Sequence, residues 1–198
     1  MNLKTLLAAL LLVTPVIQPI HADNENRTAI LAGGCFWCVE SDYEELEGIG
    51  DVVSGYIGGH VDNPTYKQVS SGKSGHIEAA IINYDPAKIS YQEILDFFWR
   101  SIDPTDNKGQ FCDKGPQYRP AIFYQNDEQQ RIAQQSLQQI RNDKPFDEPI
   151  RVELIKATKF YPAEDYHQDY YKKNPYRYKF YRYSCGRDAR VEELWGKH

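Results

Sequence analysis

Apolar and polar residues follow two different periods along the chain, and these periods predict alternating strands and helices. A short apolar run at residues 28–32 predicts a first strand. Further strands are predicted where apolar residues alternate or cluster in short runs, at residues 49–58, 76–84, 120–124 and 151–157. Within the strand at 76–84, Glu78 lies on the opposite face from Ile77 and Ala79. We expect these strands to form one sheet.

Three helices are predicted between the strands. The first opens at Cys35 and ends before Gly48, a residue type that favours helix C-termini. The second begins at Ser90-Tyr91-Gln92-Glu93, which has the spacing of a capping box, and continues as an apolar stripe to Ile102. The third covers residues 126–141. The order strand, helix, strand, strand, helix, strand matches a split βαβ plan, in which one sheet carries helices on one face.

Two segments have no regular period. Residues 103–119 are rich in turn-forming residues, and a long loop in a compact domain is more often functional than idle. Residues 160–183 are rich in tyrosine and in basic residues. Such a mixture can bind single-stranded nucleic acid, but the chain as a whole is acidic, with a net charge of −5. We therefore expect no nucleic-acid partner.

The first 22 residues have the composition of a secretory signal peptide. A basic start at Lys4 precedes an apolar run from Leu6 to Ile17, and His21-Ala22 places a small residue at the expected cleavage point. The run is short for a membrane span, so we expect an exported protein, periplasmic or secreted, without membrane attachment after cleavage. Residues 23–198 then form a single domain, for which the sequence gives no sign of oligomerisation, and we expect a monomer.

All four cysteines, Cys35, Cys38, Cys112 and Cys185, fall in the mature chain. In an oxidising compartment they could form two structural disulfides. The spacing Cys35-x-x-Cys38 is also typical of redox centres. Loss of the signal peptide would remove Met1, the one methionine of the chain, which fits exposure to methionine-oxidising conditions. Composition alone leaves the structural and the redox interpretation open.

Cys35 lies at the predicted turn between the first strand and the first helix. The first turn of a helix has unpaired N–H groups and a partial positive charge, so a thiol there is biased toward the thiolate. Gly33 and Gly34 allow a sharp turn, while Phe36 and Trp37 place apolar faces beside the sulfur. The alternative is a structural cysteine, because free cysteine often packs as a small apolar residue.

Five motifs, in this order, resemble the peptide methionine sulfoxide reductase A family. They are Gly34-Cys35-Phe36-Trp37, Asn63-Pro64-Thr65-Tyr66, Gly75-His76-Ile77-Glu78, Asp113-Lys114-Gly115-Pro116-Gln117-Tyr118-Arg119 and Ala163-Glu164-Asp165-Tyr166-His167-Gln168. The resemblance spans roughly residues 28–186 and implies reduction of the S epimer of methionine sulfoxide, free or in proteins. It also implies an α+β fold: a two-layer sandwich with ferredoxin-like (split βαβ) topology and a C-terminal extension.

This chemistry needs a thiolate that attacks the sulfoxide sulfur and a group that protonates or hydrogen-bonds the departing oxygen. Cys35 supplies the nucleophile. Glu78, if it is held among aromatic side chains, loses solvation and keeps its proton, so it can act as the acid. The resemblance places Tyr66 and Tyr118 as hydrogen-bond donors to the sulfoxide oxygen.

The same resemblance assigns Phe36 and Trp37 to the pocket for the S-methyl group. An apolar cup together with a polar cluster directed at the oxygen discriminates one epimer from the other. Asp113 is expected to orient the polar network around the nucleophile. His167 is expected to be structural rather than catalytic. We expect no cofactor and no metal at the site.

Attack leaves Cys35 as a sulfenic acid, which condenses readily with a nearby thiol. Cys185 resembles the family's usual resolving position and is favoured for that role. Cys38 is the alternative resolving residue, because its separation of three residues at a helix start permits a disulfide. Cys112 is expected to be a bystander, although its place beside Asp113 leaves a role for it open. The resemblance implies a thioredoxin-like partner that regenerates the enzyme.

Two other function classes fit parts of the pattern. A thiol–disulfide oxidoreductase would use Cys35-x-x-Cys38 alone, but it would not explain Glu78, Tyr66 and Tyr118. A zinc-binding module would use the four cysteines with histidine, but the sequence lacks the second close cysteine pair that such sites usually contain.

Overall fold

The computed structural model describes residues 27–197, so the predicted signal peptide at residues 1–22 lies outside the described residues. The strands are β1 (Arg27–Ala32), β2 (Ile49–Ile57), β3 (Ile77–Tyr84), β4 (Gly109–Gln110), β5 (Asp113–Lys114), β6 (Ala121–Tyr124), β7 (Glu153–Lys156) and β8 (Tyr161–Pro162). The α-helices are α1 (Phe36–Glu44), α2 (Tyr66–Ser70), α3 (Tyr91–Ser101), α4 (Asp127–Asp143), α5 (Tyr170–Lys173), α6 (Pro175–Cys185) and α7 (Arg187–Trp195). Among residues 27–197 we find no helix with the length and apolar character needed to cross a membrane.

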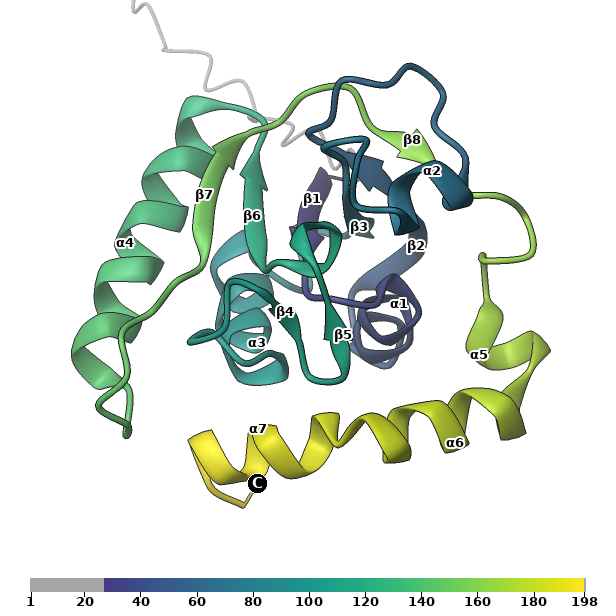
Figure 1. Cartoon of the computed structure of the whole chain (residues 1–198). Helices are drawn as coiled ribbons and strands as arrows, with labels where there is room; N and C mark the ends of the chain where they lie inside the picture. The colour runs from purple at the N-terminus through teal and green to yellow at the C-terminus, as the bar shows by residue number, and fades with distance from the viewer. Residues whose placement is uncertain (1–26, 198) are drawn as a thin grey trace, which may run out of the picture.

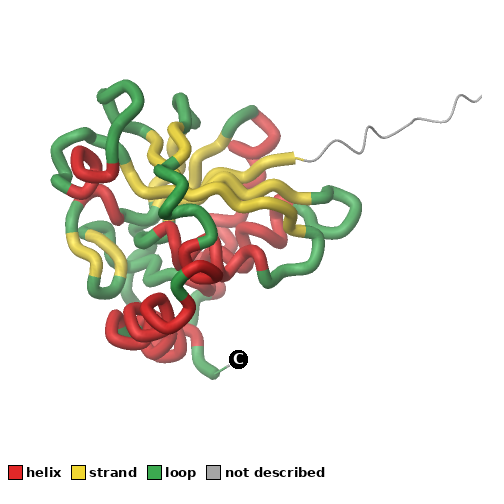
Figure 2. The backbone as a smooth tube through the Cα atoms, turned by 90° about the vertical axis from the view of Figure 1, so that its right-hand side faces the viewer, coloured by secondary structure: helices red, strands yellow, loops and turns green. Residues whose placement is uncertain are grey.

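A six-stranded sheet in the order β7-β6-β1-β3-β2-β8 forms the centre of this mixed α/β fold. Its neighbouring strands are antiparallel except for β6 and β7, which are parallel. In Figure 2 the strands form a band with most of the helical segments on one side. β4 and β5 pair separately as a small hairpin, which lies between α3 and α1 in Figure 1.

The two faces of the sheet are covered differently because side chains alternate along each strand. One face packs against α1, α3, α4 and the end of α7, in a core that includes Leu31, Ala80, Phe98, Leu137 and Trp195. The opposite face forms a smaller cluster, to which Ala157 and Phe160 of the connection after β7 contribute. The helix-covered face is therefore the main core of the domain.

The expected helix starts are present. Ser90 caps α3 and makes the predicted capping box with Glu93. Asn126 caps α4 through its side chain, which accepts a hydrogen bond from the backbone N–H of Gln129. Both caps satisfy backbone groups that a helix end otherwise leaves unpaired.

The structure adds elements that the periodicity did not predict. The turn before Tyr66 continues into α2, whose N-terminus is closed by a capping box between Thr65 and Gln68. The predicted loop at residues 103–119 contains the β4–β5 hairpin and a 3-10 turn, η1 (Pro116–Tyr118). The tyrosine-rich tail folds into α5 and α6, followed by α7, and crosses below α1 and the hairpin in Figure 1. This C-terminal segment closes one side of the site.

Candidate active site

Cys35 is the N-cap residue of α1, and its side chain makes no capping hydrogen bond. The chain reaches this position through Gly34, whose φ of +87° lies in the left-handed region. A Cβ at Gly34 would lie 2.5 Å from the Cβ of Gln110, so the turn also requires glycine for space. Gln110 is fully buried, and its side chain bonds the backbone at Asp103 and Gly109. The turn therefore holds the Cys35 sulfur against an ordered loop.

A small cavity of about 70 Å³ lies over the Cys35 sulfur. It is lined by Cys35, Phe36, Trp37, Tyr66, Glu78, Asp113, Tyr118 and Tyr181. Seven of these eight residues are those that the sequence analysis selected for the nucleophile, the acid, the oxygen donors, the methyl pocket and the orienting carboxyl group. They come from α1, α2, β3, the β4–β5 hairpin and η1, with Tyr181 added from α6. The fold thus brings all the predicted chemical groups except the resolving cysteines into one cavity.

Glu78 enters the cavity from β3 and is only 2% exposed. Its Oε2 accepts a hydrogen bond of 3.2 Å from the backbone N–H of Phe36. Burial raises the pKa of the Glu78 carboxyl well above its usual value, although the Phe36 N–H opposes this shift, and the charge of Asp113 adds to it. A neutral carboxyl group in this position can donate a proton.

The two N-terminal cysteines are both free thiols and both buried. Burial raises the pKa of the Cys35 thiol well above its usual value. A hydrogen bond with Cys35 lowers the pKa of Cys38 to about 7, and the charge of Arg187 acts in the same direction. The thiolate bias expected for Cys35 from its place at a helix N-terminus is therefore opposed by desolvation, and within the pair Cys38 ionises more readily.

Tyr66 and Tyr118 face the cavity as protonated phenols. Burial raises the pKa of Tyr66 to about 12, and it also raises the pKa of Tyr118. The position of Tyr66 is held by Glu164, whose Oε1 accepts a 2.8 Å hydrogen bond from the Tyr66 backbone N–H. The other carboxylate oxygen of Glu164 accepts from the hydroxyl group of Tyr56, also at 2.8 Å. Both phenols can therefore donate hydrogen bonds at neutral pH.

The apolar wall of the cavity is held from behind by a histidine and a tyrosine. Trp37 stacks on Tyr170 with ring centroids 3.7 Å apart and an interplanar angle of 6°. The Trp37 indole N–H donates to Nδ1 of His167 at 3.1 Å, which assigns the histidine proton to Nε2. The His167 ring also lies 5.0 Å from the ring of Phe36. His167 therefore positions the apolar wall, in agreement with a structural role.

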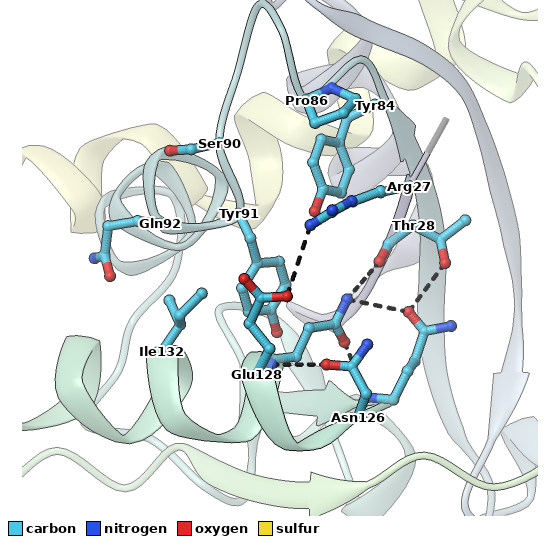
Figure 3. A pocket seen from close by; sticks show the side chains of 12 residues that line it. Arg27, Thr28, Tyr84, Pro86, Ser90, Tyr91, Gln92, Asn126, Glu128 and Ile132 are labelled. Atoms are coloured by element: carbon cyan, nitrogen blue, oxygen red, sulfur yellow. Dashed lines mark hydrogen bonds and ion pairs between the residues drawn. The ribbon is translucent and has the colours of Figure 1, made fainter. Parts of the chain in front are cut away.

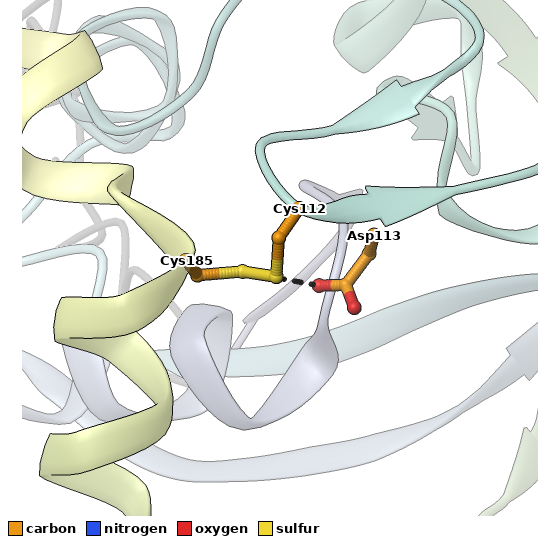
Figure 4. A group of neighbouring side chains, drawn as sticks. All are labelled: Cys112, Asp113 and Cys185. Carbon is orange, nitrogen blue, oxygen red and sulfur yellow. Dashed lines mark hydrogen bonds between the residues drawn. A yellow bond between two sulfur atoms is a disulfide. The ribbon is translucent and has the colours of Figure 1, made fainter.

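Asp113 lies where the cavity meets the C-terminal segment. Its carboxylate accepts a hydrogen bond from the Tyr181 hydroxyl. Its Oδ2 also lies 3.9 Å from the sulfur of Cys185. Figure 4 shows Cys185 at the end of α6 bonded to Cys112, beside Asp113 on the hairpin.

The disulfide between Cys112 and Cys185 differs from the sequence expectation. Cys112 was expected to be a bystander, whereas it is the bonded partner of Cys185. The two residues are 73 positions apart, and their Cα atoms are 4.8 Å apart. Only the folding of the tail across the hairpin brings them together. Of the two candidate resolving residues, Cys38 is therefore the one that is a free thiol beside Cys35.

The structure also bears on the zinc-binding alternative. Cys112 and Cys185 are bonded to each other, so their sulfurs are not thiolate ligands in this state. A second cluster of possible ligands, Glu40, Glu44 and Asp169, is bridged by the ammonium group of Lys172, which lies 2.5 Å from Glu44 and 2.8 Å from Asp169. Two of the three carboxylates in this cluster are therefore already paired with the Lys172 ammonium group.

A larger cavity of about 570 Å³ lies elsewhere, between the start of β1, the end of β3 and α4 (Figure 3). Arg27 and Glu128 form an ion pair of 3.7 Å across it. The hydroxyl group of Tyr91 points into it and has no hydrogen-bond partner among the described residues. None of the residues selected for chemistry lines this cavity. The candidate active site is therefore the smaller of the two cavities.

Two residues near the site were missed by the sequence analysis. Tyr181 lines the cavity from α6, and Arg187 begins α7 with 2% exposure. A helical period in the tail was the available signal, because Tyr178, Tyr181 and Cys185 recur at three- and four-residue spacing. The high tyrosine content of the tail made this helical period hard to distinguish in the sequence.

Comparison with known proteins gives the family. The profile described as "Peptide methionine sulfoxide reductase" matches residues 27–198. The chain belongs to the peptide methionine sulfoxide reductase family. This confirms the resemblance carried by the five motifs of the sequence.

Individual relatives of this reductase family match at high identity. The chain is 58% identical over 170 residues to "Peptide methionine sulfoxide reductase MsrA/MsrB" of Vibrio cholerae, with 86% of this chain and 45% of that protein covered. It therefore spans less than half the length of that relative. It is 47% identical to MsrA of Bacillus licheniformis, with 87% of this chain and 96% of that protein covered. Identity to MsrA of Streptococcus agalactiae is 52%, covering 84% and 98%.

Solved structures of the reductase family share the fold. Methionine sulfoxide reductase A of Corynebacterium diphtheriae matches with a TM-score of 0.67 and 28% identity, covering 78% of this chain and 77% of that chain. Mxr1 from Saccharomyces cerevisiae in reduced form matches with a TM-score of 0.66 and 33% identity, covering 76% and 86%. The central sheet with its helices is thus the reductase architecture.

Proposed function

We propose that this protein reduces the S epimer of methionine sulfoxide, free or in oxidised proteins, through nucleophilic attack by Cys35. The observation that carries this proposal is the single cavity that joins the Cys35 sulfur, the buried Glu78 carboxyl and the phenols of Tyr66 and Tyr118. Phe36 and Trp37 line the apolar side of the same cavity. Such a site binds a methyl group on one side and a polarised oxygen on the other.

The proposed reduction follows from these positions. The Cys35 sulfur attacks the sulfoxide sulfur, and the thiol gives up its proton. Glu78 donates a proton to the sulfoxide oxygen, and the two tyrosines donate hydrogen bonds to it. The oxygen is transferred to Cys35 as a sulfenic acid, and methionine leaves. Asp113 orients the polar side of the cavity without accepting the oxygen.

Resolution of the sulfenic acid is assigned to Cys38. Its thiol lies beside Cys35 in the same buried cluster; a hydrogen bond with Cys35 and the charge of Arg187 lower its pKa, so Cys38 forms a thiolate more readily than a cysteine that is only buried. Attack of the Cys38 sulfur on the sulfenic sulfur forms a Cys35–Cys38 disulfide and releases water. Cys185, favoured from the sequence, is bonded to Cys112 in this structure. A thioredoxin-like dithiol restores the thiols.

The test is methionine formation from each sulfoxide epimer separately, with excess dithiothreitol, by the protein and by Cys35→Ser. We expect reduction of the S epimer alone, abolished by the substitution. A well-folded protein that reduces neither epimer would refute the proposal. Disulfide exchange by such a protein would then favour the thiol–disulfide oxidoreductase that uses Cys35 and Cys38.

We also infer export, a monomeric state and ferredoxin-like topology. Export rests on the signal-like composition of residues 1–22, and a mature protein that begins at Asp23 by mass spectrometry is the expected result. The antiparallel strand order β6-β1-β3-β2 supports the topology, which an experimental structure tests. Light scattering tests the monomer.

A further inference from the structure

We propose that the outer face of α6 is a docking surface for an anionic lipid bilayer, formed by three exposed aromatic side chains and the cations beside them. The aromatic ridge consists of Tyr176, Phe180 and Tyr183. The contact is peripheral, since α6 has 11 residues and no helix among residues 27–197 is long and apolar enough to span a membrane. It concerns a surface away from the Cys35 cavity and does not depend on the proposed function.

Exposed aromatic side chains are concentrated on this helix. Four large apolar side chains are exposed in the described part of the chain, and three of them form the ridge, at 89% for Tyr176, 73% for Phe180 and 87% for Tyr183. Their spacing of four and three residues places them on one side of α6. Folded domains usually cover side chains of this size, and exposed apolar residues gathered on one face mark an interaction surface.

The ridge points away from the rest of the domain. On the opposite side of α6, Tyr178 and Tyr181 pack into the cluster that contains Cys35 and Cys38. Figure 1 shows α6 along the lower edge of the molecule, with α1 and the β4–β5 hairpin above it and none of the described helices or strands below it. The outer side of α6 can therefore lie flat against a planar surface.

The charge around the ridge is positive. Residues 170–185 include no aspartate or glutamate and contain five cations: Lys172, Lys173, Arg177, Lys179 and Arg182. Lys172 and Arg182 are paired with carboxylates. Arg177 and Lys179 are exposed and form no ion pair with a residue among 27–197. At 3.6 residues per turn they lie on the two sides of the ridge. The chain as a whole has a net charge of −5, so this positive surface is a local feature.

Aromatic rings flanked by cations are typical of helices that lie in a membrane interface. Tyrosine and phenylalanine rings enter the headgroup region, while lysine and arginine attract anionic headgroups. A protein interface needs about 800 Å² per partner with a matching shape, whereas a fluid bilayer can adapt to a narrow convex ridge. Base stacking uses rings along a groove that follows the nucleic-acid backbone, and α6 presents a convex surface instead. The observations therefore favour a bilayer.

The sequence analysis expected no membrane attachment after cleavage, because the apolar run at residues 6–17 is short for a span. A contact by the surface of the folded domain is a different kind of attachment. The ridge residues belong to a tail whose period was not distinguished in the sequence, and their exposure follows from the packing of the opposite side of α6.

The test is co-sedimentation with vesicles of phosphatidylcholine alone and with vesicles that also contain phosphatidylglycerol. The protein used begins at Asp23, because the apolar run from Leu6 to Ile17 could bind lipid by itself and every described helix and strand lies after it. We expect binding to the mixed vesicles only. Raising the salt from about 0.1 M to about 1 M shortens the screening length from about 10 Å to about 3 Å and should release the protein.

Two variants test the two parts of the surface. Tyr176→Ser/Phe180→Ser/Tyr183→Ser removes the aromatic rings, and Arg177→Gln/Lys179→Gln removes the flanking charges. Each variant should weaken binding to the mixed vesicles about tenfold or more, because the rings and the cations both contribute to an interfacial contact. All the substituted side chains are exposed, and circular dichroism checks that both variants remain folded.

The matched control is Arg131→Gln/Arg141→Gln on α4. It removes the same charge from two exposed positions of another helix. This variant should bind the mixed vesicles as the unsubstituted protein does. An equal loss in this control would overturn the proposal, because net charge rather than the face of α6 would then hold the protein on the vesicles.

Three further outcomes would overturn the proposal. The first is no binding of the unsubstituted protein to the mixed vesicles, and the second is undiminished binding by the variant that lacks the rings. The third is a different occupant: self-association in light scattering, or binding of a labelled single-stranded oligonucleotide, that requires the ridge while vesicles do not bind. None of these measurements reads methionine formation, so the reductase proposal is tested separately.

Discussion

Glu78 and Glu40 are two buried glutamates near α1 that have different surroundings. Both are nearly inaccessible, with exposures of 2% and 1%. Glu40 has donors on both carboxyl oxygens: Ser54 Oγ at 2.9 Å and the backbone N–H of Asp169 at 2.7 Å. Among residues 27–197, Glu78 has one hydrogen-bond donor, the backbone N–H of Phe36, and its carboxyl group lines the cavity above Cys35.

The comparison shows that a perturbed carboxyl group does not by itself identify a catalytic acid. Burial raises the pKa of both groups, and that of Glu40 rises to about 7. Glu40 holds β2 and the segment before α5 against α1, so its polar capacity is used within the fold. The Glu78 carboxyl group still has hydrogen-bonding positions that a ligand can use. The position of the group relative to the Cys35 sulfur decides between the two roles.

The largest expected effect is on turnover in Glu78→Gln. The amide oxygen can still accept from the Phe36 N–H, but the amide cannot act as a general acid, so turnover should fall about 10²-fold or more. Because burial raises the Glu78 pKa, the acid stays protonated to a higher pH than an ordinary glutamate, and the normal rate should decline as pH rises through that raised pKa. Steady-state rates against pH measure both effects.

Glu40→Gln is the matched control for this experiment. Its amide can accept from the Asp169 N–H and donate to Ser54 Oγ, so turnover should stay near normal. A normal rate in Glu78→Gln, or an equal loss in the two variants, would contradict the difference drawn between the two glutamates.

A smaller effect is expected from Tyr181→Phe. Burial raises the pKa of Asp113, and the hydrogen bond from the Tyr181 hydroxyl opposes this shift; negative charge on Asp113 in turn raises the pKa of Glu78. Loss of a hydrogen bond to a charged group should lower turnover about tenfold. The control is Tyr183→Phe on the same helix, where the side chain is 87% exposed. Equal rates in the two variants would show that the Tyr181 hydroxyl does not contribute to turnover.

The smallest expected effect concerns stability and pH at Glu40. Its folded-state pKa of about 7 lies above the usual 4.5, so the native state binds more protons between these values. The free energy of unfolding should therefore fall as pH rises from about 4.5 to 7 and level off above. Glu40→Gln removes this contribution, which urea unfolding at pH 5 and pH 8 can measure. The exposed Glu45→Gln serves as control; an unchanged slope in Glu40→Gln would argue against a raised pKa.

Much of the site could be predicted from local sequence. The apolar run before Gly33 predicts a strand, and the residues after Cys35 predict a helix. The turn that carries the nucleophile was therefore predictable as the connection between these two elements. The two-residue period of β3 places Glu78 opposite Ile77, and the structure has it on the face toward α1. The ordered motifs predicted the reductase family before any geometry was known.

Only tertiary structure decided the cysteine pairing and the charge states. Cys112 and Cys185 are 73 residues apart, and no local pattern encodes the path of α6 across the hairpin. Tyr181 reaches the cavity by the same path. The pKa of Cys35 illustrates the reason: its helix position favours the thiolate, but burial by residues distant in sequence raises its pKa. Periodicity is determined by neighbouring residues, whereas desolvation and contacts depend on the whole packed chain.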